Sequence, residues 1–352
     1  MSAKLKMRSR VALIRGNDRY DNITQALALI EEGVDLRDKK RILIKPNFVS
    51  TRRQLASTHV EAVRAVLDWL GPRYDGPITI GEGAAVSDTF DGYRNFGYLD
   101  LAEEYNVRFV DLNQDEWAPV QVYDRRLHPL PVRVAKTTLE SDFRISIGPP
   151  KTHDAVIVTL SLKNMVVGSM IRGRGGGLFQ RLGQLLPDRL TNSALAEKVK
   201  GHLSTVNRSD KFALHQGYHG LNLNLYTLAK IIAPHLSVID GFVGMEGSGP
   251  GGGDPVDLRV AIASTDFLAA DAVATRLMGF DPDEVGYLHY CKLGGLGAGD
   301  LDDIEIAGNT TVEQCAKKFR PHPTYRQQLE WRIPDVERYI TENPSEDLLG
   351  PE

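Results

Sequence analysis

The segment Ile42-Leu-Ile-Lys-Pro-Asn47 predicts a buried strand, because a short apolar run ends there in a lysine and an amide. A capping-box pattern, Thr58-His-Val-Glu61, comes next and predicts the start of a helix through Val63–Leu70. The chain then returns to a second apolar run, Ile78-Thr-Ile-Gly-Glu82. This order of strand, helix and strand predicts a parallel pair joined by a right-handed crossover.

The same alternation continues along most of the chain. The other predicted strands are Arg10–Arg15, Val107–Leu112, Phe143–Ile147, Ala155–Leu162, Leu236–Val243, Arg259–Ser264 and Ile304–Ala307. Most are apolar on both faces, which is typical of strands covered by helices on both sides. We therefore expect an α/β fold with a mixed, mostly parallel central sheet, shared by the N-terminal strands and those after Leu236.

Two segments interrupt this rhythm. Residues 168–220 contain the glycine- and arginine-rich stretch Arg172-Gly-Arg-Gly-Gly-Gly177 and no clear strand, which predicts an inserted helical or loop segment acting as a lid. Residues 321–352 predict a helical appendage on the surface. The expected organisation is one α/β domain over residues 1–320, with the insertion, followed by that appendage.

Composition limits the possible functions. The 352 residues carry 42 Lys and Arg against 46 Asp and Glu, a formal net charge of −4, which argues against a nucleic-acid binder. Apolar runs fall short of the stretch of about 20 residues that crosses a bilayer, and no signal-peptide core begins the chain. Two cysteines, Cys291 and Cys315, cannot form a disulfide framework or an iron–sulfur site. We expect a cytoplasmic protein that binds neither nucleic acid nor membrane.

Polar residues follow several predicted strands directly. Because ligands of open α/β sheets bind beyond the carboxyl ends of the strands, these residues are the candidate ligand-binding set. They are Lys45, Asn47, Lys151 and Asn164, with Gly247 and Gly249 from a later glycine-rich loop. Lys151 and His153 would point the same way if extended, although a surface turn explains them equally well.

Lys163, His153 and Glu246 are the candidate catalytic residues. Lys163 closes the run Ala155–Leu162, and a lysine entering a buried strand end needs an anionic partner or a lowered pKa. His153 or Glu246 would then act as the acid–base group. Gly247, Gly249 and Gly252 have the spacing G-x-G-x-x-G, but another predicted strand follows them instead of a helix, so a dinucleotide site is weakly supported.

The assembled motifs resemble one large family, the domain of unknown function 362. The motifs are Ile42-Leu-Ile-Lys-Pro-Asn47, Pro150-Lys-Thr-His153, Thr159-Leu-Ser-Leu-Lys-Asn164, Val238-Ile-Asp-Gly241, Met245-Glu-Gly-Ser-Gly-Pro250 and Ala263-Ser-Thr-Asp266, in the family's order. Many members of that family carry ferredoxin-like cysteine clusters. This chain has no such cluster, so the resemblance implies no resident iron–sulfur centre, and its cofactor is unknown.

Three functions remain open. The first is an enzyme acting on a phosphate- or carboxylate-bearing small molecule, with Lys45, Lys151 and Lys163 binding the anion. The second is a metal- or metallocofactor-dependent enzyme with His153, Glu82 and Glu246 as ligands. The third is a non-catalytic binding or accessory protein.

Overall fold

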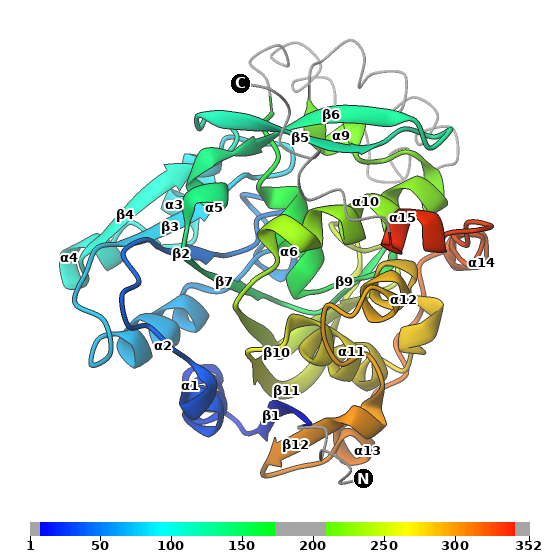
Figure 1. Ribbon diagram of the computed structural model, residues 1–352. Coiled ribbons are helices and arrows are strands. Elements are labelled where there is room, and N and C mark those ends of the chain that lie inside the picture. The colour runs from blue at the N-terminus through cyan, green and yellow to red at the C-terminus, as the bar shows by residue number, and fades with distance from the viewer. Residues whose placement is uncertain (1–7, 173–208, 342–352) are drawn as a thin grey trace, which may run out of the picture.

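The computed structural model describes residues 8–172 and 209–341, which surround one ten-stranded sheet (Figure 1). Its main path runs β12-β1-β11-β10-β7-β2-β3-β4, and β8 and β9 branch from β10. The strands are β1 (Ser9–Arg15), β2 (Ile42–Lys45), β3 (Ile78–Glu82), β4 (Val107–Asp111), β7 (Phe143–Gly148), β8 (Lys151–His153), β9 (Ile157–Thr159), β10 (Leu236–Glu246), β11 (Asp254–Ser264) and β12 (Ile304–Gly308).

The sheet is mixed and mostly parallel. All pairs from β10 through β7, β2 and β3 to β4 are parallel, whereas β11 runs antiparallel to both β1 and β10. The expected fold class is confirmed, and the N-terminal strands share this sheet with the strands after Leu236.

Helices cover both faces of the sheet. The helices α1 (Arg19–Ile30) and α2 (Val60–Leu70) form one core with the sheet, and α6 (Ser161–Gly168), α10 (Gly217–Ile232) and α11 (Phe267–Leu277) form the other. Successive strand residues point to opposite faces, so Val238 lies in the first core and Ile239 in the second.

Shorter helices complete the described part of the chain. They are α3 (Thr89–Asn95), α4 (Leu101–Glu104), α5 (Lys136–Glu140), α9 (Asp210–Ala213), α12 (Gly286–Leu293), α13 (Val312–Cys315), α14 (Tyr325–Gln328), α15 (Glu337–Thr341), and the 3-10 turns η1 (Glu31–Gly33), η2 (Gln54–Ala56), η3 (Pro282–Glu284) and η4 (Leu301–Asp303). None of the helices in this part of the chain is long and apolar enough to cross a membrane.

The strands β5 (Trp117–Tyr123) and β6 (Pro129–Ala135) form a hairpin, at the top of Figure 1, that the sequence pattern did not predict. Val120 pairs with Val132, and both are buried. Prolines within both strands obscure the alternation of apolar and polar residues that would predict a strand. Proline is tolerated in a two-stranded ribbon because each strand has a free edge.

The prediction of one strand over Ala155–Leu162 is wrong. Only Ile157–Thr159 is a strand, and α6 begins at Ser161. Asp271 on α11 explains the change, because its carboxylate accepts the backbone N–H groups of Ser161 and Leu162 at 2.9 and 3.1 Å. A cap supplied by a distant residue starts the helix, and a short apolar run cannot reveal it.

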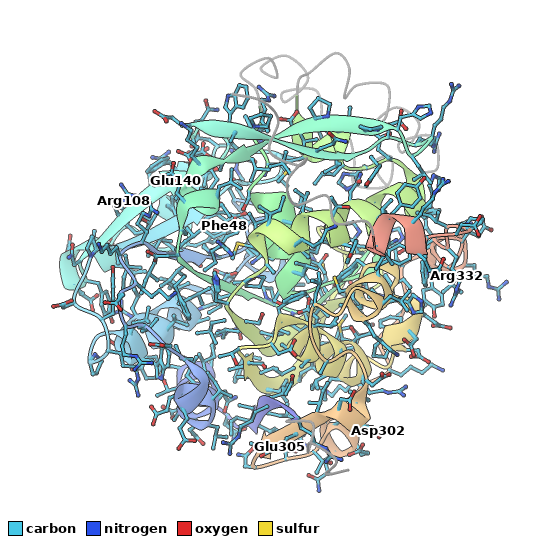
Figure 2. The ribbon with its side chains drawn as sticks, viewed as in Figure 1. Phe48, Arg108, Glu140, Asp302, Glu305 and Arg332 are labelled. Carbon is cyan, nitrogen blue, oxygen red and sulfur yellow. The ribbon has the colours of Figure 1, made fainter. Side chains whose placement is uncertain are left out.

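The segment after residue 320 forms short helices at the periphery, and a few of its side chains are buried in the core beneath them. Trp331 is 1% exposed, and its indole N–H donates to the carbonyl of Glu284. Gln328 is equally buried and donates to the carbonyl of His153. The charged side chains labelled in Figure 2 at Asp302, Glu305 and Arg332 project outward, as expected for a solvated periphery. Residues 342–352 lie outside the described residues.

Candidate functional site

The strands β2 and β7 lie side by side but lead to opposite faces of the sheet. After β2 the chain enters α2 and continues to β3, whereas after β7 it enters α6 on the other face and later returns as β10. In open α/β sheets, ligands bind beyond the carboxyl ends of two strands that are connected in this way. The residues that follow these two strands are therefore the natural candidates.

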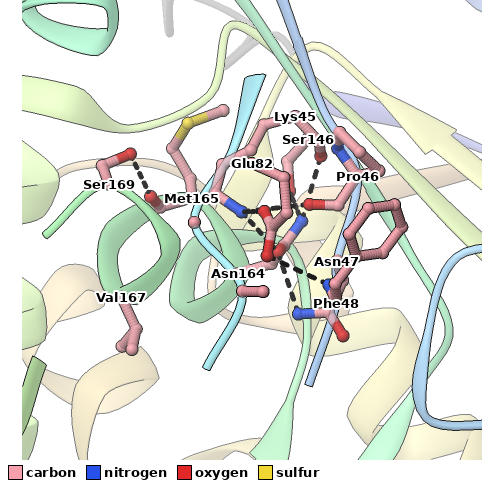
Figure 3. A network of polar contacts seen from close by, with 12 residues as sticks. Lys45, Pro46, Asn47, Phe48, Glu82, Ser146, Asn164, Met165, Val167 and Ser169 are labelled. Carbon is pink, nitrogen blue, oxygen red and sulfur yellow. Dashed lines mark hydrogen bonds and ion pairs between the residues drawn. The ribbon is translucent and has the colours of Figure 1, made fainter. Parts of the chain in front are cut away.

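The side chain of Lys45, the last residue of β2, is fully buried beside Glu82 at the end of β3 (Figure 3). Its ammonium group pairs with the Glu82 carboxylate and donates to Asn164 Oδ1 at 2.9 Å and to the Pro46 carbonyl at 3.0 Å. The second Glu82 oxygen accepts the backbone N–H of Phe48. All three lysine protons thus have acceptors.

Asn164, on α6, connects the ends of β2 and β7. Its side-chain N–H groups donate to the carbonyl of Lys45 at 3.2 Å and to the hydroxyl of Ser146 at 3.0 Å (Figure 3). Its oxygen accepts from both Lys45 and the amide of Asn47. A helix residue thereby fixes the relative position of two strand ends.

Lys151 is fully buried on β8 and donates to Asn47 Oδ1 and to the carbonyl of Ala56. Asn47 is itself fixed, because its backbone N–H donates to the hydroxyl of Thr58. Thr58 therefore does not cap α2 as its sequence pattern predicted; His59 occupies that position. Lys45, Asn47, Lys151 and Asn164 form one hydrogen-bonded group, called here the lysine cluster.

Lys211, on α9, is a neighbour that the sequence analysis missed. It is 4% exposed and donates to the carbonyls of Gly83 and Val167, each at 3.0 Å. A Cβ at Gly83 would lie 2.9 Å from its ammonium nitrogen, so a side chain there would displace it. Gly83, directly after Glu82, could have indicated a close approach by another side chain. The sequence does not show that this side chain is Lys211.

Burial changes the acidity of these ammonium groups. Loss of hydration, together with the charge of nearby Lys163, lowers the pKa of Lys151 to about 7, although the charge of Glu82 opposes the shift. Loss of hydration also lowers the pKa of Lys211 to about 7. For Lys45 burial lowers the pKa, and the Glu82 charge counteracts it. The pKa values of Lys151 and Lys211 therefore lie well below the ordinary value for lysine.

Lys163 was predicted to lie at a strand end. It lies instead in the first turn of α6, where its side chain is 6% exposed. Its charge acts on both Lys151 and His153. His153 lies with Lys151 on β8, so the extended geometry is confirmed and the surface turn is excluded. Burial, helped by Lys163, lowers the pKa of His153 to about 3, which leaves its ring neutral at pH 7.

Glu246 lies outside the lysine cluster. Met245, its neighbour on β10, pairs with Lys151, and side chains alternate along a strand, so Glu246 points to the other side. Its carboxylate accepts the backbone N–H of Arg320 at 2.9 Å.

The glycine-rich loop after Glu246 offers no free donor at its two predicted positions. The N–H of Gly247 donates to the carbonyl of Arg320, and that of Gly249 to the carbonyl of Gly247. A Cβ at Gly249 would collide with the backbone of Thr152, so this glycine permits close packing against β8.

The three proposed metal ligands have separate partners. Glu82 pairs with Lys45, Glu246 contacts Arg320, and His153 lies 3.0 Å from Asp154. Across residues 8–172 and 209–341, no group of three or more His, Cys, Asp or Glu side chains could hold a metal ion.

Most of the predicted lid, residues 173–208, lies outside the described residues. At its two described flanks, Arg172 and Ser209 form an isolated β-bridge. The Arg172 guanidinium donates to the carbonyl of Ser87 at 2.7 Å. The lid stays a prediction.

Comparisons with known proteins agree with the motifs. The family model described as Domain of unknown function (DUF362) matches residues 42–276. The chain is similar to the Thylakoid-associated protein sll1697 of Synechocystis sp. (strain ATCC 27184 / PCC 6803 / Kazusa), with 26% identity over 244 residues. The alignment covers 69% of this chain and 64% of that protein, so this chain spans less than two thirds of the relative's length. Among solved structures, it is similar to the lactate racemase apoprotein from Thermoanaerobacterium thermosaccharolyticum, with a TM-score of 0.45 and 13% identity over 78% of this chain and 58% of that one.

Proposed function

The chain belongs to the family described as Domain of unknown function (DUF362), and from its buried lysine cluster we propose an enzyme that acts on an anionic small molecule. The substrate carries a phosphate or carboxylate group, which binds beyond the carboxyl ends of β2 and β7. This is the position where an open α/β sheet accommodates a ligand.

One observation carries the proposal: Lys151 and Lys211 are buried but hydrogen-bond only to neutral oxygens among the described residues. A buried ammonium group without a carboxylate contact either loses its proton or gains an anionic partner. When no ligand is bound, the lowered pKa of both groups favours loss of the proton. A bound anionic substrate would instead keep the ammonium groups charged, because it supplies the anionic partner that they lack.

The residues then take separate roles. Lys163 and Lys151 bind the anionic group, and Lys151 transfers the proton, since its pKa of about 7 matches neutral conditions. This assignment replaces His153 and Glu246 as the acid–base group. A neutral His153 orients the ligand by hydrogen bonding, and Asn47 and Asn164 hold the lysines in place.

Thermal unfolding with phosphate, sulfate or acetate at constant ionic strength tests the proposal. A ligand that binds the native state alone raises the melting temperature. Lys163→Met should unfold in chloride like the parent but lose most of the anion-dependent shift, whereas exposed Lys318→Met should keep it. A Lys163→Met protein with the parent's full shift would contradict the role of Lys163 and favour Lys45 and Lys151.

Two further measurements separate the other functions. Metal analysis of the purified protein that finds a stoichiometric ion would favour the metal-dependent alternative. An anionic ligand that binds but is never transformed would favour a binding or accessory protein.

A cytoplasmic location is part of the proposal. Cys291 and Cys315 are both free and buried, which suits a reducing compartment. The relative's name, by contrast, associates that protein with thylakoids. Fractionation of tagged protein tests the location, and recovery with membranes would contradict it.

A further inference from the structure

A cavity of about 420 Å³ lies at the amino end of the sheet, opposite the lysine cluster. Phe143, the first residue of β7, and His235, which precedes β10, both line it. Three basic side chains line it as well, from Lys39, Arg144 and Lys230. A cavity of this size accommodates a small ligand.

Arg144 is 9% exposed, and its contacts are to neutral acceptors. Its Nη1 donates to the carbonyl of Ser141 at 2.8 Å and its Nε to the carbonyl of Ala233 at 3.1 Å. Buried arginines are normally paired with a carboxylate, because desolvating an isolated guanidinium is costly. Loss of hydration accordingly lowers the pKa of Arg144 to about 10.

The acidic side chains nearby are engaged elsewhere. Asp142, whose charge acts on Arg144, accepts the backbone N–H groups of Lys40 and Arg41, both at 3.0 Å. Asp35 lines the cavity but pairs with the exposed side chain of Arg37 at 2.7 Å.

The two lysines of the cavity also lack a carboxylate contact within the described residues. Lys230 lies over the ring of Tyr226 at 4.9 Å, and Lys39 forms no ion pair with the described residues, although its charge helps to lower the pKa of Asp142. With Arg144 they supply three positive charges against the one carboxylate of Asp35, so the lining carries about two net positive charges.

The ring of His235 adds a donor beside the guanidinium. Its Nδ1 accepts the backbone N–H of Arg144 at 3.0 Å, so the proton of the neutral ring lies on Nε2. Nε2 is 3.5 Å from Arg144 Nη2, and a guanidinium nitrogen can only donate a hydrogen bond. The ring stacks on Phe143 with centroids 5.5 Å apart, which fixes its orientation. Two N–H donors therefore lie side by side without a mutual hydrogen bond.

We propose that this cavity binds the phosphate group of a small molecule, with one oxygen accepting from both Arg144 Nη2 and His235 Nε2. Lys39 and Lys230 contribute the remaining positive charge. A phosphate dianion matches the net charge of the lining, whereas a carboxylate does so only in part. The site is separate from the lysine cluster and does not depend on the function proposed for it.

Nuclear magnetic resonance of the full chain, labelled at the histidine rings, tests this site. His235→Gln identifies the signals of His235 by their loss. Inorganic phosphate should shift those signals in a saturable way, while sodium chloride at the same ionic strength should not. Acetate should bind more weakly. An acetate affinity equal to that of phosphate, or a phosphate response that never saturates, would overturn the proposal.

Variants separate this site from the lysine cluster. Lys39→Gln should raise the dissociation constant for phosphate about two- to fivefold, since it removes one partly exposed charge. Lys40→Gln, an exposed neighbour of the same charge outside the lining, should leave it unchanged. Lys163→Met should also retain the His235 response. Equal effects of Lys39→Gln and Lys40→Gln would overturn the proposal, because they would show only general electrostatic attraction.

Discussion

Lys45 and Glu82 form an ion pair in which the two side chains are 0% and 2% exposed. The pair joins the ends of two neighbouring parallel strands, and Asn164 adds a helix to the contact. A pair this deeply buried positions its neighbours more than it stabilises the fold, because desolvation offsets most of the Coulomb attraction.

Lys45→Met should destabilise the protein by about 3–5 kcal/mol, because it leaves the Glu82 carboxylate buried without its cation. Adding Glu82→Leu should recover much of that loss, since the carboxylate that Lys45→Met leaves without its cation is then removed as well. Urea unfolding of the parent, both single variants and the double variant gives the coupling energy. Additive losses would show that the pair is not coupled.

Gly168→Ala should cost about 1–3 kcal/mol, because the added Cβ would occupy the position of the Lys45 ammonium group. Gly71→Ala is the matched control: its Cβ would lie 3.7 Å from the nearest atoms, so stability should change little. Denaturation midpoints measure both. Equal midpoints for the two variants would contradict the close packing at Gly168.

Stability should rise with pH between about 7 and 10, because of Lys151. Its pKa is about 7 in the folded protein and 10.5 ordinarily, so in that range the unfolded chain holds a proton that the folded chain has released. Each such lysine contributes at most about 1.4 kcal/mol per pH unit. Lys211, shifted in the same direction, adds to the slope.

Lys151→Met should therefore reduce the slope by about half. Urea unfolding at pH 7, 8 and 9 measures it, and Lys318→Met serves as the control because its side chain is exposed. A Lys151→Met protein with the parent's slope would show that Lys151 stays charged in the fold.

Asp271→Ala should destabilise the protein by about 1–3 kcal/mol, because it removes the acceptor for two backbone N–H groups of α6. Burial raises the pKa of Asp271 to about 6 from an ordinary 3.8, so between these values the folded chain holds a proton that the unfolded chain has released, and stability should fall as the pH rises through this range. Asp271→Ala should abolish this pH dependence. In hydrogen exchange the amides of Ser161 and Leu162 should lose protection first. Uniform loss across the sheet would indicate a global effect instead.

Much of the lysine cluster could be predicted from strand ends. Lys45 and Asn47 end one apolar run and Lys151 comes four residues after another, and parallel strands bring their carboxyl ends to one edge. Glu246 could not be placed in this way, because a one-residue change along a strand moves a side chain to the opposite face. Lys211 follows a stretch without strand pattern, so only the folded chain brings it to Gly83.

The α/β class, the mixed sheet and the family could all be predicted from the amino-acid sequence, because apolar periodicity and local motifs act over short distances along the chain. Three features could be seen only in the folded chain: the helix over residues 161–168, the burial of Trp331 from the C-terminal segment, and the approach of lysines distant in sequence to one another. Those features depend on contacts between residues far apart in sequence, such as Asp271 with Ser161, and no local pattern encodes such contacts.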